Sequence, residues 1–270
     1  MSIAFTKMSG SGNDFVVIDN RYPVMDETDK KDFVVKVCAP KTSVGADGVI
    51  FIENSETADF KWDFFNADGS HAEMCGNGGR CAARFAVENS IASGNVTFET
   101  LAGIISAEVK GDVVKIKLTP PQNLREDVCL GFQGANYLLD SINTGVPHAI
   151  IYSDDVETED VMRVGQGIRF HNEFSPQGTN VDFVEKKDEH SLKIRTYERG
   201  IEGETLACGT GAVASALLLA NKKEVESPVE VETRGGEILK VHFEESNGSI
   251  QDVYLEGSTR IAFVGTLVDL

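Results

Sequence analysis

Two cysteine-glycine stretches hold the residues of this 270-residue chain that are best suited to chemistry. They are Cys75-Gly76-Asn77-Gly78 and Cys208-Gly209-Thr210-Gly211, and each runs into an alanine-rich, helix-favouring segment. A cysteine just before a helix has backbone N–H donors and the positive end of the helix dipole beside its sulfur, and both lower the pKa of a thiol. One such stretch more often marks a packing cysteine, but two copies favour a pair of reactive thiols.

A pair of thiols facing one carbon atom can invert a stereocentre. A thiolate on one face removes a proton while a thiol on the other face delivers one. The helix starts at Gly76-Asn77 and Gly209-Thr210 would hold a carboxylate and neutralise the enolate-like charge beside the reacting carbon. This chemistry requires no cofactor, and the sequence contains neither a zinc-ligand spacing nor a dinucleotide or phosphate-loop motif. We therefore expect a proton-transfer enzyme without metal or cofactor.

The two stretches are 133 residues apart, and the same offset aligns much of the chain. It superimposes Gly12 on Gly145, Gly45 on Gly178, Glu99-Thr100 on Glu232-Thr233, and Gly103 on Gly236. Such a sustained register predicts an internal duplication, with one cysteine at a helix start in each half and the two facing each other. The same offset pairs Asn66 with Arg199, and Asp47 with Asn180.

Each half is predicted to be rich in strands around one central helix. The helices are expected at 80–89 and from Cys208 to about Asn221, and further helices at 29–38 and 160–168. The strands are expected at 3–7, 15–19, 49–53, 61–65, 95–100, 103–109, 113–118, 136–143, 149–152, 181–185, 192–197, 229–233, 237–243 and 252–256. This order predicts an α+β fold of two pseudo-symmetric lobes, each a mainly antiparallel sheet or barrel around its central helix. The lobes are expected at 1–118 and 119–260, meeting near Pro120-Pro121.

Composition excludes several classes of partner and place. The net charge of −18 argues against nucleic acid and against anionic membranes, which both require a basic surface. No apolar run reaches the roughly 18 residues of a membrane span, and no signal peptide is expected at the N-terminus. Five cysteines without a small secreted framework indicate free thiols in a reducing compartment. We expect a cytoplasmic protein that acts on a small molecule.

Other polar residues near the cysteine stretches have two interpretations each. Glu198-Arg199 could bind the ammonium and carboxylate of a zwitterion, or could be an ordinary surface pair. Asn66 and Asn180 could line the same site or simply stabilise turns. His148 could tune a thiol or be a structural histidine. The residues alone leave these alternatives open.

At these residues the sequence resembles the diaminopimelate epimerase family, and the resemblance covers nearly the whole chain. It is carried by Lys7 to Phe15, Phe65 to Ser70, Cys75 to Cys81, Pro147-His148, Thr179-Asn180, Tyr197 to Gly200 and Ala207 to Gly211. The resemblance implies interconversion of LL- and meso-2,6-diaminopimelate, with Cys75 and Cys208 as the two bases. It implies that Gly76, Asn77, Gly209 and Thr210 hold the reacting carboxylate. It also implies that Asn13, Asn66, Asn180, Glu198 and Arg199 hold the rest of the substrate, with His148 and Glu198 assisting catalysis.

The resemblance has further implications and two departures. It places the last strand, 261–270, back in the first lobe, and it implies a homodimer in lysine and peptidoglycan precursor synthesis. Family members often have glutamine where Gly48 stands and asparagine where Val146 stands. Two rival functions are a related proline or hydroxyproline racemase and a non-catalytic amino-acid-binding protein of the same fold. The racemase would have different motifs around its thiols, and the binding protein would not need both thiols.

Overall fold

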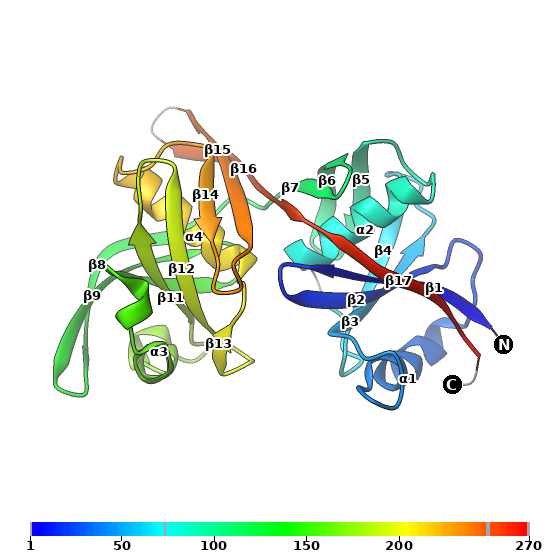
Figure 1. Cartoon of the computed structure of the whole chain (residues 1–270), viewed down its shortest axis with the longest axis horizontal. Helices are drawn as coiled ribbons and strands as arrows, with labels where there is room; N and C mark the ends of the chain where they lie inside the picture. The colour runs from blue at the N-terminus through cyan, green and yellow to red at the C-terminus, as the bar shows by residue number, and fades with distance from the viewer. Residues whose placement is uncertain (1, 73, 247–248, 269–270) are drawn as a thin grey trace. The chain divides into compact units, whose positions relative to one another are not determined.

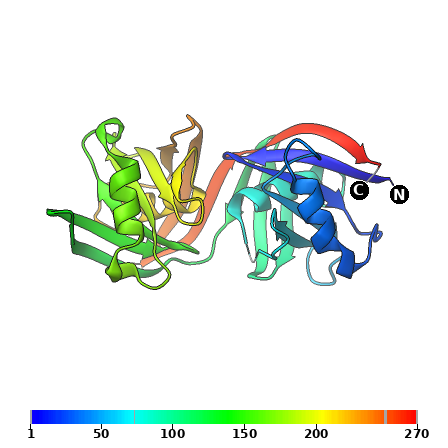
Figure 2. The same ribbon diagram turned by 90° about the horizontal axis from the view of Figure 1, so that it is seen from below.

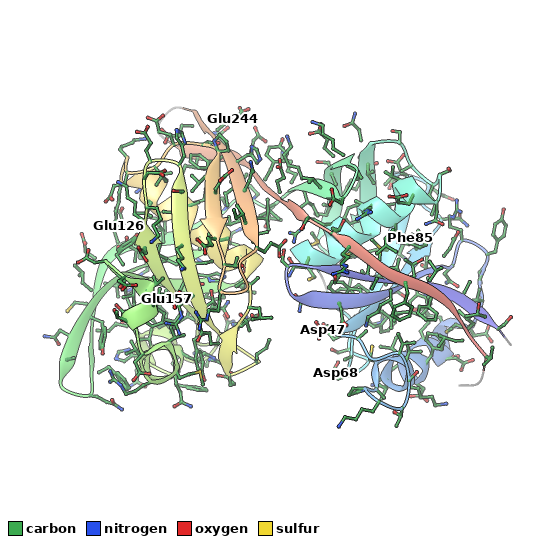
Figure 3. The ribbon with its side chains drawn as sticks, in the orientation of Figure 1. Asp47, Asp68, Phe85, Glu126, Glu157 and Glu244 are labelled. Carbon is green, nitrogen blue, oxygen red and sulfur yellow. The ribbon has the colours of Figure 1, made fainter. Side chains whose placement is uncertain are left out.

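The computed structural model describes residues 2–72, 74–246 and 249–268. The chain forms two compact units, of which unit 1 comprises Met1–Lys117 with Gly257–Leu270 and unit 2 comprises Leu118–Glu256. Within the described residues, no helix is both long and apolar enough to span a membrane. Acidic side chains such as Glu126, Glu157 and Glu244 are exposed on unit 2 (Figure 3).

Unit 1 is an eight-stranded mixed sheet with two helices. Its strands follow the order β17-β1-β2-β3-β4-β5-β6-β7, in which β2–β3 and β4–β5 are parallel and the other pairs antiparallel. The elements are β1 (Ile3–Gly10), β2 (Asn13–Asp19), α1 (Glu27–Cys38), β3 (Gly48–Glu53), β4 (Phe60–Asn66), α2 (Gly76–Glu88), β5 (Asn95–Thr100), β6 (Gly103–Lys110), β7 (Val113–Lys117) and β17 (Arg260–Leu267). Strand β17, the last of the chain, lies along β1 (Figure 1).

Unit 2 repeats this order of strands. It runs β8-β9-β10-β11-β12-β14-β15-β16, with β10–β11 and β12–β14 parallel and β13 added on β12. The elements are β8 (Gln122–Phe132), β9 (Ala135–Asn143), β10 (Pro147–Tyr152), η1 (Val156–Thr158), α3 (Val161–Arg169), η2 (Asn172–Phe174), β11 (Asn180–Lys186), β12 (Ser191–Glu198), β13 (Gly203–Thr205), α4 (Gly209–Asn221), β14 (Val229–Glu232), β15 (Ile238–Ser246) and β16 (Ser249–Ser258). The α+β prediction of two similar halves is confirmed.

One helix of each unit is central and the other is peripheral. Helix α2 packs against β1, β2, β3, β5, β6 and β7, and α4 packs against the corresponding strands of unit 2. Residues Gly211 to Ala220 of α4 are all buried, as expected for a helix that is apolar on every side. Helices α1 and α3 instead cover one face of their own sheets, α1 on β3–β4 and α3 on β11–β12 (Figure 2). Each unit is therefore a sheet curved around a helix, with a second hydrophobic core beneath the outer helix.

The constant offset of 133 residues is wrong for two strands of each unit. In unit 1 Phe15 lies opposite Gly48, whereas in unit 2 His148 lies opposite Asn180. The spacing is thus 133 residues between the first strands but 132 between β3 and β11. The connection before β11 is one residue shorter, and the residue is regained before Cys208. By strand register, Asn180 therefore corresponds to Gly48 rather than to Asp47, and Glu198 rather than Arg199 corresponds to Asn66.

Candidate active site

Both cysteines are the N-cap residues of the central helices. Cys75 has extended backbone angles, and its sulfur accepts the Gly78 N–H at 3.5 Å, so the thiol satisfies one of the free donors of the first turn of α2. Cys208 has the same extended conformation at the start of α4. Each unit therefore presents a sulfur beside the positive end of a buried helix, as the sequence predicts.

The two thiols have different surroundings. Cys75 is half-buried, whereas Cys208 is buried, with 6 % of its surface exposed. Burial raises the pKa of the Cys208 thiol far above its usual value, and the negative charges of Asp182 and Glu198 raise it further, against the opposing effect of the Thr210 hydroxyl. For Cys208, burial outweighs the helix terminus, and the resting form of this residue is the neutral thiol.

In unit 1 a chain of hydrogen bonds connects the start of α2 with the turn before β2. The Asn77 amide donates to Asn13 Oδ1 at 2.8 Å, and the Asn13 amide donates to Asp47 Oδ2 at 2.9 Å. Arg80, which is fully buried, donates to Asn77 Oδ1 at 2.9 Å and to Ser11. The structure thus joins Asn13 and Asn77, and it adds Asp47 and Arg80, which the sequence does not single out for this role.

Asn66 lies at the exposed end of β4, opposite Gly48 in the strand register. Its amide donates to Ser70 Oγ at 3.1 Å, within the turn that contains Asp68. Asp47 and Asp68 both lie in loops at the ends of strands of unit 1 (Figure 3). At Gly48 itself, an added Cβ would lie 2.5 Å from the Phe65 carbonyl oxygen. The glutamine common in the family at this position would therefore require β4 to move.

In unit 2, polar side chains converge beneath the start of α4. His148 and Asp182 are completely buried, and His148 Nδ1 lies 2.7 Å from Asp182 Oδ2. His148 Nε2 lies 2.9 Å from the Thr210 hydroxyl, which in turn lies 3.5 Å from the Cys208 sulfur. Asn180 approaches His148 Nε2 at 3.4 Å and accepts the Arg199 backbone N–H at 2.8 Å.

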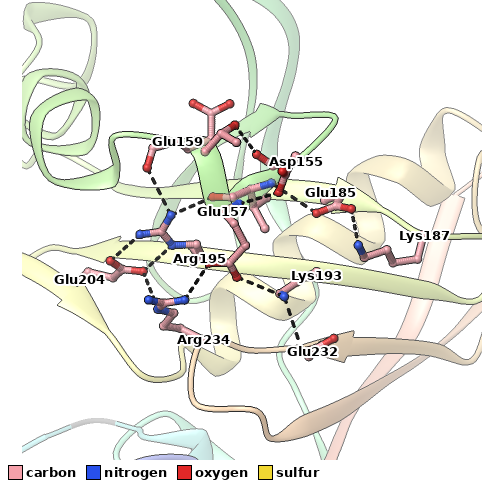
Figure 4. A network of polar contacts seen from close by, with 12 residues as sticks. Asp155, Glu157, Glu159, Glu185, Lys187, Lys193, Arg195, Glu204, Glu232 and Arg234 are labelled. Atoms are coloured by element: carbon pink, nitrogen blue, oxygen red, sulfur yellow. Dashed lines mark hydrogen bonds and ion pairs between the residues drawn. The ribbon is translucent and has the colours of Figure 1, made fainter.

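Glu198 and Arg199 end β12 and begin the loop that leads to Cys208. Both are half-buried, and the Arg199 guanidinium donates to the Gln177 carbonyl at 3.4 Å. The loop returns as β13, which is held on β12 by Arg195. This arginine is 9 % exposed, forms a two-pronged ion pair with Glu204 and donates to the carbonyl oxygens of Val156 and Glu159 (Figure 4).

Two groups of side chains have spacings that a metal ion could use. His148, Asp182 and Cys208 form one, and Glu27, Asp63 and His71 form the other. In the first group, both ring nitrogens of His148 and both oxygens of Asp182 already have hydrogen-bonding partners. In the second group, the Lys30 ammonium lies 2.6 Å from Glu27 and 2.7 Å from Asp63 and supplies the positive charge itself. Neither group is a natural metal centre on these contacts.

Asp182 is the most informative residue that sequence reasoning missed. It is a fully buried carboxylate in a strand of apolar residues, between Val181 and Phe183. The signal was present, since an acidic residue inside a buried strand needs a hydrogen-bonding partner. What the sequence could not identify was that this partner is His148.

Comparison with known proteins agrees with this arrangement. The Diaminopimelate epimerase family matches residues 5–123 and 141–261. The chain is 51 % identical over 274 residues to the diaminopimelate epimerase of Aquifex aeolicus strain VF5, with 97 % of each chain covered. It is 47 % identical over 276 residues to that of Hydrogenobaculum sp. strain Y04AAS1, again with 97 % of each covered.

Solved structures with the same fold are more distant in sequence. A phenazine biosynthesis protein of the PhzF family from Bacillus anthracis is similar over 100 % of both chains, with a TM-score of 0.78 and 16 % identity. A probable proline racemase from Agrobacterium radiobacter K84 is similar over 99 % of this chain and 93 % of its own, with a TM-score of 0.72 and 16 % identity. These likenesses show the fold alone. The sequence matches along nearly the full length show that the chain belongs to the diaminopimelate epimerase family.

Proposed function

We propose that this chain interconverts LL- and meso-2,6-diaminopimelate without a cofactor, in the synthesis of lysine and of peptidoglycan precursors. The observation that carries the proposal is the paired placement of Cys75 and Cys208, each capping the central helix of one of two equivalent units. The relatives named diaminopimelate epimerase, with up to 51 % identity, support this choice of substrate.

The two cysteines would act on one α-carbon from opposite faces. One sulfur removes the α-proton as a thiolate, and the other delivers a proton as a thiol, which inverts the centre. The neutral resting form of Cys208 suits the delivering role in the first turnover. This proposal requires that the starts of α2 and α4 close on the same substrate molecule.

The helix starts would stabilise the charge that develops during proton removal. The N–H groups of Gly76, Asn77, Gly209 and Thr210 are aimed along their helix axes and can hold the reacting carboxylate. An α-proton beside a carboxylate is very weakly acidic, so donors already aimed at the developing enediolate are the main source of rate.

The far end of the substrate carries a second ammonium and a second carboxylate. We assign Arg199 to that carboxylate and Glu198 to an ammonium group, since the two lie side by side at the end of β12. Asn13, Asn66 and Asn180, from the strand ends of both units, would complete the polar contacts. His148 and Glu198 would assist the proton transfers.

Replacing each cysteine tests the two-base mechanism. Cys75→Ala and Cys208→Ala should each abolish epimerisation of diaminopimelate while leaving the circular dichroism spectrum unchanged, because inversion needs a proton donor or acceptor on both faces. The assay includes proline and hydroxyproline, which the wild type should leave unchanged. A single variant that retains more than a few per cent of wild-type turnover would contradict the mechanism.

A homodimer is the second part of the proposal. Strand β17 pairs with β1, and Val264 and Phe263 on it are 73 % and 49 % exposed. A long apolar edge strand is a ready surface for pairing with a second copy. Val264→Lys should convert the dimer to a monomer in analytical ultracentrifugation. Two free catalytic thiols also require a reducing compartment, which supports a cytoplasmic location.

A further inference from the structure

A row of four side chains leads from a buried carboxylate to the Cys208 thiol. Asp182 contacts His148 at 2.7 Å, His148 contacts Thr210 at 2.9 Å, and Thr210 contacts Cys208 at 3.5 Å. The members come from three elements, β11, β10 and the start of α4. Gly211 lets the last of these approach closely, since an added Cβ there would lie 2.3 Å from Asp182 Oδ1.

The neighbours of His148 determine which ring nitrogen carries its proton. Asp182 Oδ1 accepts the Thr196 hydroxyl at 2.7 Å, and its Oδ2 faces Nδ1, so the carboxylate requires a proton on Nδ1. Asn180 Oδ1 accepts the Arg199 backbone N–H, which turns the Asn180 amide NH₂ group toward Nε2. A donor on that side requires a lone pair on Nε2. Both contacts therefore select the neutral ring with its free lone pair facing Thr210.

Unit 1 shows that the fold does not need these polar groups. In the strand register, Phe15 corresponds to His148, Ile50 to Asp182 and Phe64 to Thr196. The apolar three pack together beneath the start of α2, with Phe15 and Phe64 in edge contact at 5.8 Å and Ile50 beside Gly78. Burying a carboxylate and an imidazole in place of such residues costs free energy of folding. The polar set is found beneath Cys208 because it acts there.

We propose that Asp182 is a positioning residue for the epimerisation: through His148 and Thr210 it holds a proton acceptor in line with the Cys208 thiol. This inference rests on the proposed function, in which Cys208 must exist in both protonation states. Asp182 does not touch the substrate. It fixes the ring of His148 in the tautomer and orientation that the transfer requires.

The proton transfer balances without any other reactant. In the resting state the Cys208 S–H donates to Thr210 Oγ1, the Thr210 O–H donates to His148 Nε2, and the His148 Nδ1–H donates to Asp182. As the S–H bond breaks, its proton joins Thr210 Oγ1, and the hydroxyl's former proton passes to Nε2. The products are a thiolate, an intact threonine, an imidazolium and an unchanged carboxylate. The Asn180 amide beside Nε2 opposes a permanent imidazolium, so the proton returns once the thiolate has been reprotonated.

The test compares turnover with the protonation state of His148. Asp182→Asn should lower kcat for LL-diaminopimelate about 10²-fold, the scale of general acid–base assistance, and change KM by less than about threefold. Thr210→Val should lower kcat similarly, and Thr210→Ser, which keeps the hydroxyl, should lie much closer to the wild type than Thr210→Val does. In ¹⁵N-histidine NMR spectra, wild-type His148 should be protonated at Nδ1 alone, and Asp182→Asn should lose that preference.

Asp140→Asn is the matched control. Asp140 is another buried carboxylate of unit 2, bonded to Tyr152 at 2.6 Å and to Lys222 at 2.7 Å, away from the start of α4. It should lose stability but keep kcat and the His148 tautomer. An Asp182→Asn protein that keeps kcat within threefold of an active wild type would overturn the inference. So would His148 protonated at Nε2 in the wild type. If Asp182→Asn fails to fold, the contrast between Thr210→Val and Thr210→Ser decides. A wild type inactive on diaminopimelate refutes the proposed function, and the NMR result then judges the Asp182–His148 arrangement separately.

Discussion

At the scale of single residues, Cys208 is a thiol that the fold keeps protonated. Its burial and the nearby charges of Asp182 and Glu198 oppose the thiolate, although the helix start favours it. The same group must therefore be costly to the protein in alkaline solution, where an unfolded chain ionises its cysteines freely.

This cost predicts a pH-dependent stability. Above about pH 8.5 the unfolded chain loses the Cys208 proton while the folded chain retains it, so the raised pKa lowers the free energy of unfolding as pH rises. Cys208→Ala should therefore gain stability relative to the wild type between about pH 8 and pH 10, by at most about 1.4 kcal/mol per pH unit. Urea unfolding at several pH values measures this, with the exposed Cys129→Ala as control. Parallel curves for wild type and Cys208→Ala would show that burial does not hold the proton.

Arg199 should determine the choice of substrate. A guanidinium that grips the far carboxylate in a desolvated site contributes on the order of 2 to 5 kcal/mol when it is lost. Arg199→Ala and Arg199→Lys should therefore lower kcat/KM for diaminopimelate by roughly 10²- to 10³-fold. Lysine lacks the far carboxylate and should be a very poor substrate of the wild type. If Arg199→Ala leaves the preference for diaminopimelate over lysine unchanged, Arg199 has only a structural role.

At the scale of elements, the stability of β13 depends on one buried arginine within a larger surface network (Figure 4). Arg195 holds Glu204 and two carbonyl oxygens, whereas Arg234, 44 % exposed, reaches Glu157 and Glu204 from the solvent side. Arg195→Met should cost about 3 kcal/mol of unfolding free energy, because it leaves buried acceptors unpaired. Arg234→Met should cost less than about 1 kcal/mol. Equal losses in urea unfolding would show that burial of Arg195 does not matter.

The sequence predicted most strands because their apolar residues alternate with polar ones. Strand β8 was missed since its register with β9 shifts twice, and positive φ angles at Asn123 and Asp127 break the alternation. The short β13 has no buried side chain to reveal it. The one-residue difference before β11 was also invisible, because glycines on both sides keep the offset of 133.

Within the candidate site, the cysteines were identifiable because their local spacing alone defines a helix start. Asp182 and Arg80 were not, since what distinguishes them is a partner far along the chain. Asp182 bonds His148, 34 residues away, and Arg80 bonds Ser11, 69 residues away. Such pairs become visible only when the strand register is known.

At the scale of the whole molecule, unit 1 is assembled from both ends of the chain. Ile3, at the start of β1, lies opposite Leu267, at the end of β17. A circular permutant that joins the old termini by a short linker, begins at Leu118 and ends at Lys117 should therefore fold, because each unit becomes continuous in sequence. We expect its melting temperature and epimerase activity to remain near those of the wild type. A second permutant, opened between Val16 and Val17 inside β2, should fail to fold. Failure of the first would mean that the connection between β7 and β8 is itself essential.

The place of β17 also determines the order in which a ribosome can complete the protein. Unit 1 is begun first, but β1 gains its outer neighbour only after all of unit 2 has been translated. Until then the nascent chain exposes an unpaired strand edge, which is open to association with other chains. A message cut short anywhere before its last codons yields a whole second unit and an incomplete first one. Full-length translation is thereby checked by the fold itself.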